Sequence, residues 1–419
     1  MTPSRDQVML VPVVSSLHEP KSVARVISSY REWLAGAIDG ETHPVSKLGR
    51  KDTAAVKDAA GLLVLVVTGG TERLIQTLAR TGRPVLVLAH ELMNSLPAAL
   101  ESLSSLDKAS RPQLVLGKDA SELRKVREFS EAARAFARIG GRRLGLVGGP
   151  SPWLTYSLPD REALSRKLGI RLVDIPMSEF SRAHENVDKK LVTELAADAR
   201  SGAESIDQFG VEEFERATRI YLAIKSIATR HRLGSVSLKC FDFIKEFKIT
   251  GCYAVARLND EGVVAGCEGD IPATTAMIVL SEIAKQPCFL GNVSFVREHE
   301  LALAHCTVAP TLTTKYQYRT HFESGIGIAV AGSLRHGARV TVARFSRKLD
   351  RLRAGEGLVV KGDGWNDDLC RTQLEIRMDG NAEAVKDDPL GNHHVLTYGE
   401  HLGTLRNMAA FAGIRLEEL

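Results

Sequence analysis

Cysteine is scarce in this sequence. Six of its 419 residues are cysteines, all between Cys240 and Cys370, and none forms a Cys-x-x-Cys pair. The N-terminal stretch also lacks a long apolar core followed by a small-residue cleavage site. These absences predict a reduced, cytoplasmic protein.

Long apolar runs are absent as well. No uninterrupted run approaches the roughly 20 residues that a membrane-spanning helix needs, and "LLVLVV" at 62–67 suits a buried strand. A strong excess of charge is also missing, since 55 basic residues face 51 acidic ones and the formal net charge is +4. We therefore expect a soluble protein with no membrane or nucleic-acid partner, whose binding comes from a local site.

Two kinds of stretch resemble binding motifs but lack their defining residues. The basic stretch at 335–353 contains one aromatic residue, Phe345, and alternates like a strand, which favours a subunit contact or a solvated edge over RNA binding. The glycine pairs in "TGGTE" at 68–72 and "VGGPS" at 147–151 match neither the dinucleotide fingerprint nor the phosphate-binding loop. We interpret both pairs as turns between a strand and a helix.

What the sequence does contain is a regular alternation of apolar runs and helical patterns. Its rhythm is typical of parallel sheets wrapped by helices, and beyond about residue 290 it changes to short alternating strands. The predicted fold is therefore α/β, with two doubly wound parallel-sheet domains and a β-rich, barrel-like antiparallel domain that a helix over 401–414 closes. The expected domains are residues 1–139, 140–290 and 291–419.

Two carboxylates, Glu268 and Asp270, stand one residue apart in "GCEGDIPATTAM" at 266–277. The runs "YAVARL" at 253–258 and "GVVAGC" at 262–267 flank a turn and are expected to be strands, and helical spacing begins after Asp270. Asp270 is then a candidate N-cap. Glu268 would lie at the carboxyl edge of a parallel sheet, where open α/β folds bind ligands, although a purely local role is the alternative.

Histidines further along the chain have the chemistry of divalent-metal ligands. They are His305 in "LAHCTVAP" and the pair His393 and His394 in "GNHHVLTYG". Neighbours in a strand point to opposite faces, so only one of the pair can reach a site on a given face. Imidazole and carboxylate ligands together suit Mn²⁺ and its neighbours, whereas a lone strand histidine is often structural.

Six stretches, in their order along the chain, carry a family likeness. They are "HELMNSLPAALE" at 90–101, "LVGGPSPWL" at 146–154, residues 238–270, "AHCTVAP" at 304–310, "HFESGIG" at 321–327 and residues 391–414. Together they resemble the L-fucose isomerase and L-arabinose isomerase superfamily, and within it the shorter fucose-isomerase-like proteins. The resemblance covers most of the chain. It implies a homo-oligomeric enzyme that binds Mn²⁺, or another divalent ion such as Co²⁺ or Mg²⁺, and interconverts an aldose and a ketose through an enediol.

The same resemblance implies roles for single residues. Glu268 matches a metal ligand that also transfers a proton, His305 a ligand of the arabinose branch, and His394 the C-terminal histidine ligand. His393 is then expected either to contact the substrate or to be a polar residue that supports the ligands. The implied assembly is a trimer or hexamer with sites between subunits, so that His90 and Asn94 would reach a neighbour's metal.

One position departs from the family pattern. Asn292 stands where the family has its second carboxylate, and an amide can coordinate a metal through its oxygen but cannot exchange a proton. Isomerisation needs one group to take a proton and another to serve the oxygens. Asp270, Asp242 or a metal-bound water could supply the second group, and a shift of the alignment by a few residues is the remaining alternative.

Polar residues that could hold the hydroxyls of a sugar complete the set of candidates. They are Trp153, His321, Glu323, Trp365, Arg371 and Gln373. Each has a surface or interface role as its alternative, and Arg371 and Gln373 share one face of a strand whose side chains could simply be solvated. An anionic substituent on the sugar could meet Arg319, Lys315 or Arg371.

Two other classes of function stay open at this point. A metal-dependent epimerase or carbon–carbon lyase also passes through a metal-held enolate, and a sugar-binding regulator could use paired α/β domains without catalysis.

Overall fold

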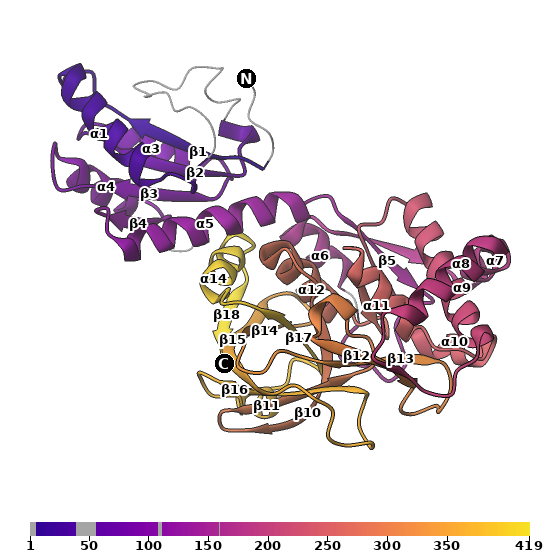
Figure 1. Ribbon diagram of the computed structural model, residues 1–419. Helices are drawn as coiled ribbons and strands as arrows, with labels where there is room; N and C mark the ends of the chain where they lie inside the picture. Colours follow the sequence, from indigo (N-terminus) through magenta and orange to yellow (C-terminus); the bar gives the residue numbers. More distant parts are fainter. Residues whose placement is uncertain (1–5, 39–55, 108–110, 159) are drawn as a thin grey trace. The chain divides into compact units, whose positions relative to one another are not determined.

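The computed structural model describes residues 6–38, 56–107, 111–158 and 160–419, and the chain divides into two compact units (Figure 1). The first unit comprises residues up to Arg138 together with Gly403–Phe411, and the second comprises Ile139–Leu402 and Ala412–Leu419. The expected boundaries at 139/140 and 290/291 stay a prediction. None of the helices in the described ranges is both long and apolar enough to cross a membrane.

The first unit is built on a parallel sheet with strand order β1-β2-β3-β4. Its elements are β1 Val8–Val13, α1 Pro20–Trp33, β2 Gly61–Val66, α3 Glu72–Ala79, β3 Val85–Ala89, α4 Ser95–Ser104, β4 Gln113–Leu116, α5 Ala120–Ile139 and α14 Leu402–Phe411. Strand β2 is buried throughout because it has helices on both faces. Leu63 packs with residues of α1 and α5 on one face, whereas Val64 packs with residues of α3 and α4 on the other.

The second unit contains a parallel sheet with order β6-β5-β8-β9. Its elements up to the end of this sheet and the helix that follows are β5 Arg143–Val147, α6 Arg161–Leu168, β6 Arg171–Ile175, α7 Met177–Glu185, α8 Lys189–Ser201, β7 Ser205–Ile206, α9 Val211–Arg230, β8 Ser235–Leu238, α10 Cys240–Phe247, α11 Cys252–Asp260, β9 Val264–Cys267 and α12 Ile271–Ala284. The strand order reverses beside β5, and open α/β folds bind ligands at the carboxyl ends of the strands next to such a reversal.

The rest of the second unit is mostly antiparallel. Its elements are β10 Phe289–Arg297, β11 Glu300–His305, the 3-10 helix Pro310–Leu312, β12 Lys315–Thr320, β13 Ile328–Ser333, β14 Arg339–Phe345, β15 Arg351–Lys361, β16 Thr372–Met378, α13 Ala384–Asp387, β17 His393–Tyr398 and β18 Arg415–Glu418. Strands β14-β17-β10-β11-β16-β15 form a barrel that closes through the β14–β15 pairing, and β18 adds to β15 in parallel. Strands β7, β12 and β13 form a smaller sheet.

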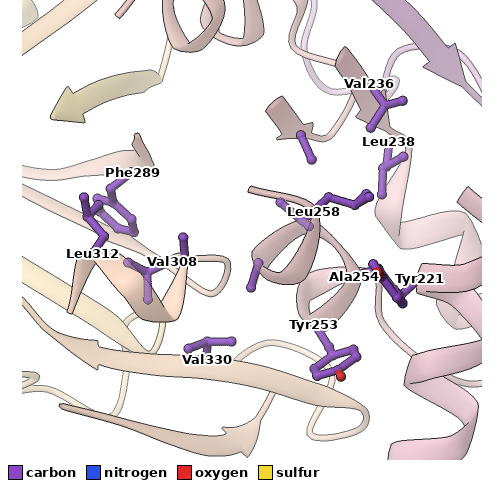
Figure 2. Packing of buried hydrophobic residues seen from close by; sticks show 14 of the residues in the cluster. Tyr221, Val236, Leu238, Tyr253, Ala254, Leu258, Phe289, Val308, Leu312 and Val330 are labelled. Carbon is purple, nitrogen blue, oxygen red and sulfur yellow. The ribbon is translucent and has the colours of Figure 1, made fainter. Parts of the chain in front are cut away.

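Helix α12 connects the parallel sheet to the barrel. It packs on β8 and β9 of the sheet and on β14 and β17 of the barrel. Every residue from Ile271 to Leu280 is buried, because the helix has protein on all sides. One apolar cluster therefore continues from the sheet into the barrel, and Figure 2 shows part of it, from Val236 in β8 through Leu258 in α11 to Phe289 in β10.

The predicted α/β fold with two parallel sheets and an antiparallel barrel is confirmed. The strand expected at 253–258 is wrong, because these residues lie in helix α11. This helix packs between α9, β9 and β13, so most of its residues are buried and the apolar run lacks a solvent-facing stripe. Such a short apolar run has no period that separates a buried helix from a strand. The predicted strand that follows and the predicted C-terminal helix are confirmed as β9 and α14.

Candidate functional site

Glu268 is the first residue after β9, at the carboxyl edge of the second unit's parallel sheet. Its backbone has φ +60 and Gly269 follows with φ +72, so the chain turns sharply before α12 begins. A non-glycine residue in the left-handed region is unusual, and such strain occurs often at functional sites. The turn is held from the loop after β5, where the N–H of Ser151 donates to the carbonyl oxygen of Glu268 (2.9 Å).

The Glu268 side chain is largely buried, with 12% of its surface exposed. The indole N–H of half-exposed Trp153 donates to Oε2 at 2.7 Å, and Nε2 of His393 lies 3.7 Å from Oε1. Burial alone would raise the pKa of Glu268, but the neighbouring His393 and the Trp153 hydrogen bond outweigh it and lower that pKa. Glu268 is therefore an anion that faces the imidazole of His393.

His393 lies at the start of β17 and is fully buried. Its Nδ1 donates to Oδ2 of Asp270 at 3.0 Å, whereas its buried Nε2 has no hydrogen-bond partner. Burial alone would lower the pKa of His393, but the two carboxylates of Asp270 and Glu268 raise it to about 9. A carboxylate on Nδ1 and an unpartnered Nε2 are the arrangement that metal-binding histidines usually have.

His305, the last residue of β11, completes a group of three potential ligands with Glu268 and His393. One ligand atom from each residue lies within 4.8 Å of the others. The hydroxyl of Thr307 pairs with Nδ1 of His305 at 2.8 Å. Burial, reinforced by the positive charge of His393, lowers the pKa of His305 to about 3 and keeps its ring neutral, as a ligand must be. One carboxylate and two imidazoles fit a divalent ion such as Mn²⁺ or Co²⁺.

The adjacent His394 does not belong to this group. We expected His394 to be the ligand that accompanies Glu268 and His305, but His393 has that place. Side chains alternate along β17, and His394 is in phase with Leu396 and Tyr398 of the apolar core. Its Nδ1 lies 3.1 Å from the carbonyl oxygen of Asn392. His393 itself lies in the group of potential ligands, and its expected contact with the substrate stays a prediction.

Asp270 caps helix α12 as predicted, since its Oδ1 accepts from the N–H of Ala273 at 2.9 Å. Its Oδ2 accepts from Arg344 at 2.7 Å and from His393, and no part of the side chain is exposed. Burial alone would raise the pKa of Asp270, but Arg344 and His393 lower it well below its ordinary value. The acid–base role expected of Asp270 therefore lacks the access to substrate that proton exchange requires.

Asn292 in β10 lies directly opposite His393 of β17. Its Oδ1 accepts a hydrogen bond from Nδ2 of Asn392, and its Nδ2 lies 3.9 Å from Sγ of Cys370. The cross-strand position brings Asn292 next to the site. Its predicted role as a metal ligand stays a prediction.

His321 and Glu323 follow β12 and lie within electrostatic range of Glu268. Burial and the charge of Arg371 lower the pKa of His321 to about 4, with Glu268 opposing the shift. Partial burial, and then the charge of Glu268, raise the pKa of Glu323. The ring of Phe241, in the first turn of α10, lies 5.8 Å from that of His321 and 4.9 Å from that of Trp153. Trp153 and His321 are thus linked through one aromatic ring beside Glu268.

A cavity of about 490 Å³ is lined by three further residues that we predicted to bind substrate, Trp365, Arg371 and Gln373. Lys315 and Arg319 line the same cavity. Trp365 is partly exposed, and Nε of Arg371 donates to the carbonyl oxygen of Thr320 at 2.8 Å. Gln373 is buried and makes four hydrogen bonds to the backbone of residues 365–370. It therefore stabilises this loop and has no free amide group for a sugar.

His90 and Asn94 belong to the first unit, in the turn between β3 and α4. Nε2 of His90 donates to the carbonyl oxygen of Val67 at 3.1 Å, and its Nδ1 accepts from the N–H of Leu92 at 3.2 Å. Asn94 has φ +56 and makes no side-chain cap bond. Both ring nitrogens of His90 thus have partners within the first unit. The expected trimer or hexamer, and the contact of these residues with a neighbour's metal, stay predictions.

Three residues of the site were missed by the sequence interpretation: Phe241, Thr307 and Arg344. Only Arg344 carries a usable signal, because it is in phase with buried Val340 and Val342 of a strand interpreted as a subunit contact or a solvated edge. A charged residue at a position that the alternation assigns to the core indicates a buried ion pair.

Comparison with known proteins finds relatives of low identity. No family model matches the chain. A sulfoquinovose isomerase from Priestia aryabhattai is 24% identical over an alignment of 304 residues that covers 66% of this chain and 64% of that protein. A sulfoquinovose isomerase from Clostridium sp. (strain MSTE9) is 23% identical over an alignment of 273 residues that covers 62% of this chain and 60% of that protein. The chain thus spans less than two thirds of the length of the curated relatives it matches.

Proposed function

We propose that this protein is a metal-dependent isomerase that interconverts an aldose and a ketose. The observation that carries the proposal is the group of Glu268, His305 and His393 at the carboxyl edge of a parallel sheet, with the buried Nε2 of His393 unpartnered. The likeness to proteins named sulfoquinovose isomerase supports the same reaction class. It also leads us to propose a sugar with an anionic substituent.

The three side chains would hold a divalent ion through one carboxylate and two imidazoles. When bound, such an ion supplies a Lewis acid for the carbonyl and hydroxyl oxygens at carbons 1 and 2 of the sugar. Asp270 holds His393 by Nδ1, so that Nε2 faces Glu268 and would become a ligand atom on losing its proton, which a bound metal displaces.

Glu268 is the group that we assign to proton transfer between the two carbons. In the aldose-to-ketose direction its carboxylate takes the proton from carbon 2 and returns it to carbon 1, so that no net proton is consumed. Trp153 donates to Oε2 of Glu268 and so fixes the orientation of the carboxylate. Because Glu268 is anionic at neutral pH, it begins the cycle as a base.

The second proton must move between the two sugar oxygens, and Asn292 and Asp270 are unsuited to that step. We assign it to Glu323, a partly buried carboxyl group whose pKa is raised by its burial and by the charge of Glu268. His321, neutral because of its burial, is the polar group we place against a sugar hydroxyl. Arg371 and Arg319 are the cations that we expect to meet an anionic substituent.

The test is a panel of aldoses incubated with the protein and Mn²⁺ in deuterated water and followed by NMR. The panel holds neutral hexoses and their 6-phosphate and 6-sulfonate derivatives. We expect ketose formation with deuterium at carbon 1 or 2 from an anionic member. Glu268→Gln should abolish ketose formation. Glu298→Gln is the control and should leave it unchanged, because 78% of the Glu298 side chain is exposed.

Other outcomes would identify the alternatives. Inversion of a carbon without ketose formation would indicate an epimerase, and cleavage products a lyase. Sugar binding without exchange on any member would indicate a regulator and contradict the proposal.

A further inference from the structure

Arg344 in β14 is a charged residue in the interior of the second unit, with none of its side chain exposed. Removing a guanidinium from water costs several kcal/mol unless hydrogen bonds and an opposite charge compensate it. Such a residue is therefore informative when its partners belong to a candidate site.

Four segments of the chain accept hydrogen bonds from this one guanidinium. Nη1 donates to Oδ2 of Asp270 (2.7 Å) and to the carbonyl oxygen of His393 (2.8 Å). Nη2 donates to Oγ of Ser157 (2.7 Å), and Nε donates to the carbonyl oxygen of Leu390 (2.9 Å). The side chain thus binds the cap of α12, the first residue of β17, the loop after β5 and the loop before β17.

The space around Arg344 is shaped for it. Gly391 has φ +108, and a Cβ there would collide with Nη2 of Arg344. Only glycine fits next to the guanidinium in this conformation.

The contact with Asp270 connects Arg344 to the candidate site. Both Arg344 and Nδ1 of His393 donate to the same oxygen, Oδ2, while Oδ1 is held by the backbone of α12. The carboxylate is therefore fixed at both oxygens, and its orientation fixes the plane of the His393 ring. Arg344 also binds the backbone of His393, so it holds this residue from two directions.

We propose that Arg344 is a positioning residue for His393: through Asp270 and the His393 carbonyl it keeps Nε2 directed at Glu268 and His305. The proposal deepens the proposed function and rests on it, because this orientation of Nε2 matters only if His393 binds a metal. Arg344 itself touches neither substrate nor metal. Groups that orient a metal-binding histidine typically contribute about 10- to 100-fold in metal affinity.

The test compares Arg344→Lys with Arg353→Lys. Arg353 is a matched control because it is also buried, in the neighbouring strand β15, but it pairs with Asp388 and Glu417 and not with the site. Lysine keeps the charge and lacks the planar fork that serves four acceptors at once. Mn²⁺ alone is the probe, with its affinity measured by calorimetry on the full chain.

We expect Arg344→Lys to bind Mn²⁺ about 10- to 100-fold more weakly than the wild type, with Arg353→Lys within about twofold of it. A second readout is the ¹H–¹⁵N signal of the His393 Nδ1–H in histidine-labelled, metal-free protein. It should shift or vanish in Arg344→Lys and persist in Arg353→Lys. Equal Mn²⁺ affinity in all three proteins, or equal loss in both variants, would overturn the proposal.

Two further outcomes separate this proposal from the function it rests on. If the wild type binds no Mn²⁺, the proposed function fails. The positioning role is then tested by the NMR signal alone, and an unchanged His393 signal in Arg344→Lys would overturn it as well. If Arg344→Lys does not fold, Ser157→Ala removes one of the four acceptors and leaves the charge paired. It should give a smaller loss of affinity in the same direction, and unchanged affinity would overturn the proposal.

Discussion

Replacing Gly269 by alanine tests whether the turn after β9 sets the position of Glu268. Gly269 has φ +72, and a Cβ there would lie 2.6 Å from the carbonyl oxygen of Gly149 and 2.6 Å from Cα of Pro150. Both are backbone atoms, and the N–H of nearby Ser151 already donates to the carbonyl oxygen of Glu268. The loop therefore cannot yield without displacing the carboxylate.

The expected magnitude follows from two contributions. A left-handed backbone costs an L residue about 1–2 kcal/mol, and overpacking against fixed atoms about 1–3 kcal/mol more. Gly262 is the matched control, because it has φ +80 and a Cβ added to it would meet no atom within 4 Å. Gly262→Ala should show only the first cost.

Urea unfolding of the metal-free protein measures both variants. We expect Gly269→Ala to be the less stable of the two by about 1–3 kcal/mol and to bind Mn²⁺ more weakly than Gly262→Ala does. Equal stability and equal Mn²⁺ affinity in the two variants would refute the reasoning, since the close approach of the two loops would then be unimportant.

Two more perturbations probe the surroundings of the site. Trp153→Phe keeps a ring but removes the N–H that donates to Glu268, so we expect kcat/KM to fall about tenfold or more in steady-state assays; an unchanged value would contradict the role of this hydrogen bond. Burial lowers the pKa of His394 to about 3, against about 6.5 in an unfolded chain. The unfolded chain then binds more protons between these values, so stability falls as pH falls, by about 2 kcal/mol from pH 7 to pH 5. Urea unfolding should show that His394→Gln loses less stability between pH 7 and pH 5 than the wild type does, by this same amount. An equal loss of stability in the two proteins would contradict the reasoning.

The sequence predicts the layers of this fold well because the apolar runs are regular. Strand β2 reads as a continuous apolar run, as a parallel strand buried on both faces does. Helix α11 escapes prediction because burial on all sides removes the stripe that would reveal its period.

The candidate site is predictable in part. Alternation establishes that only one of His393 and His394 can face Glu268, but the choice depends on where the N-terminus of α12 lies against β17, and that is a tertiary property. The sequence likewise identifies Asp270 as a cap without showing that Arg344, 74 residues away, shares its carboxylate. Contacts at such separation arise only from the packed fold.

The most direct test of the central claim is the position of a bound metal. Crystals grown with Mn²⁺ and measured for anomalous scattering should show a peak within about 2.5 Å of ligand atoms of Glu268, His305 and His393. A fully occupied Mn²⁺ peak elsewhere in the chain, with these three side chains unligated, would contradict the account.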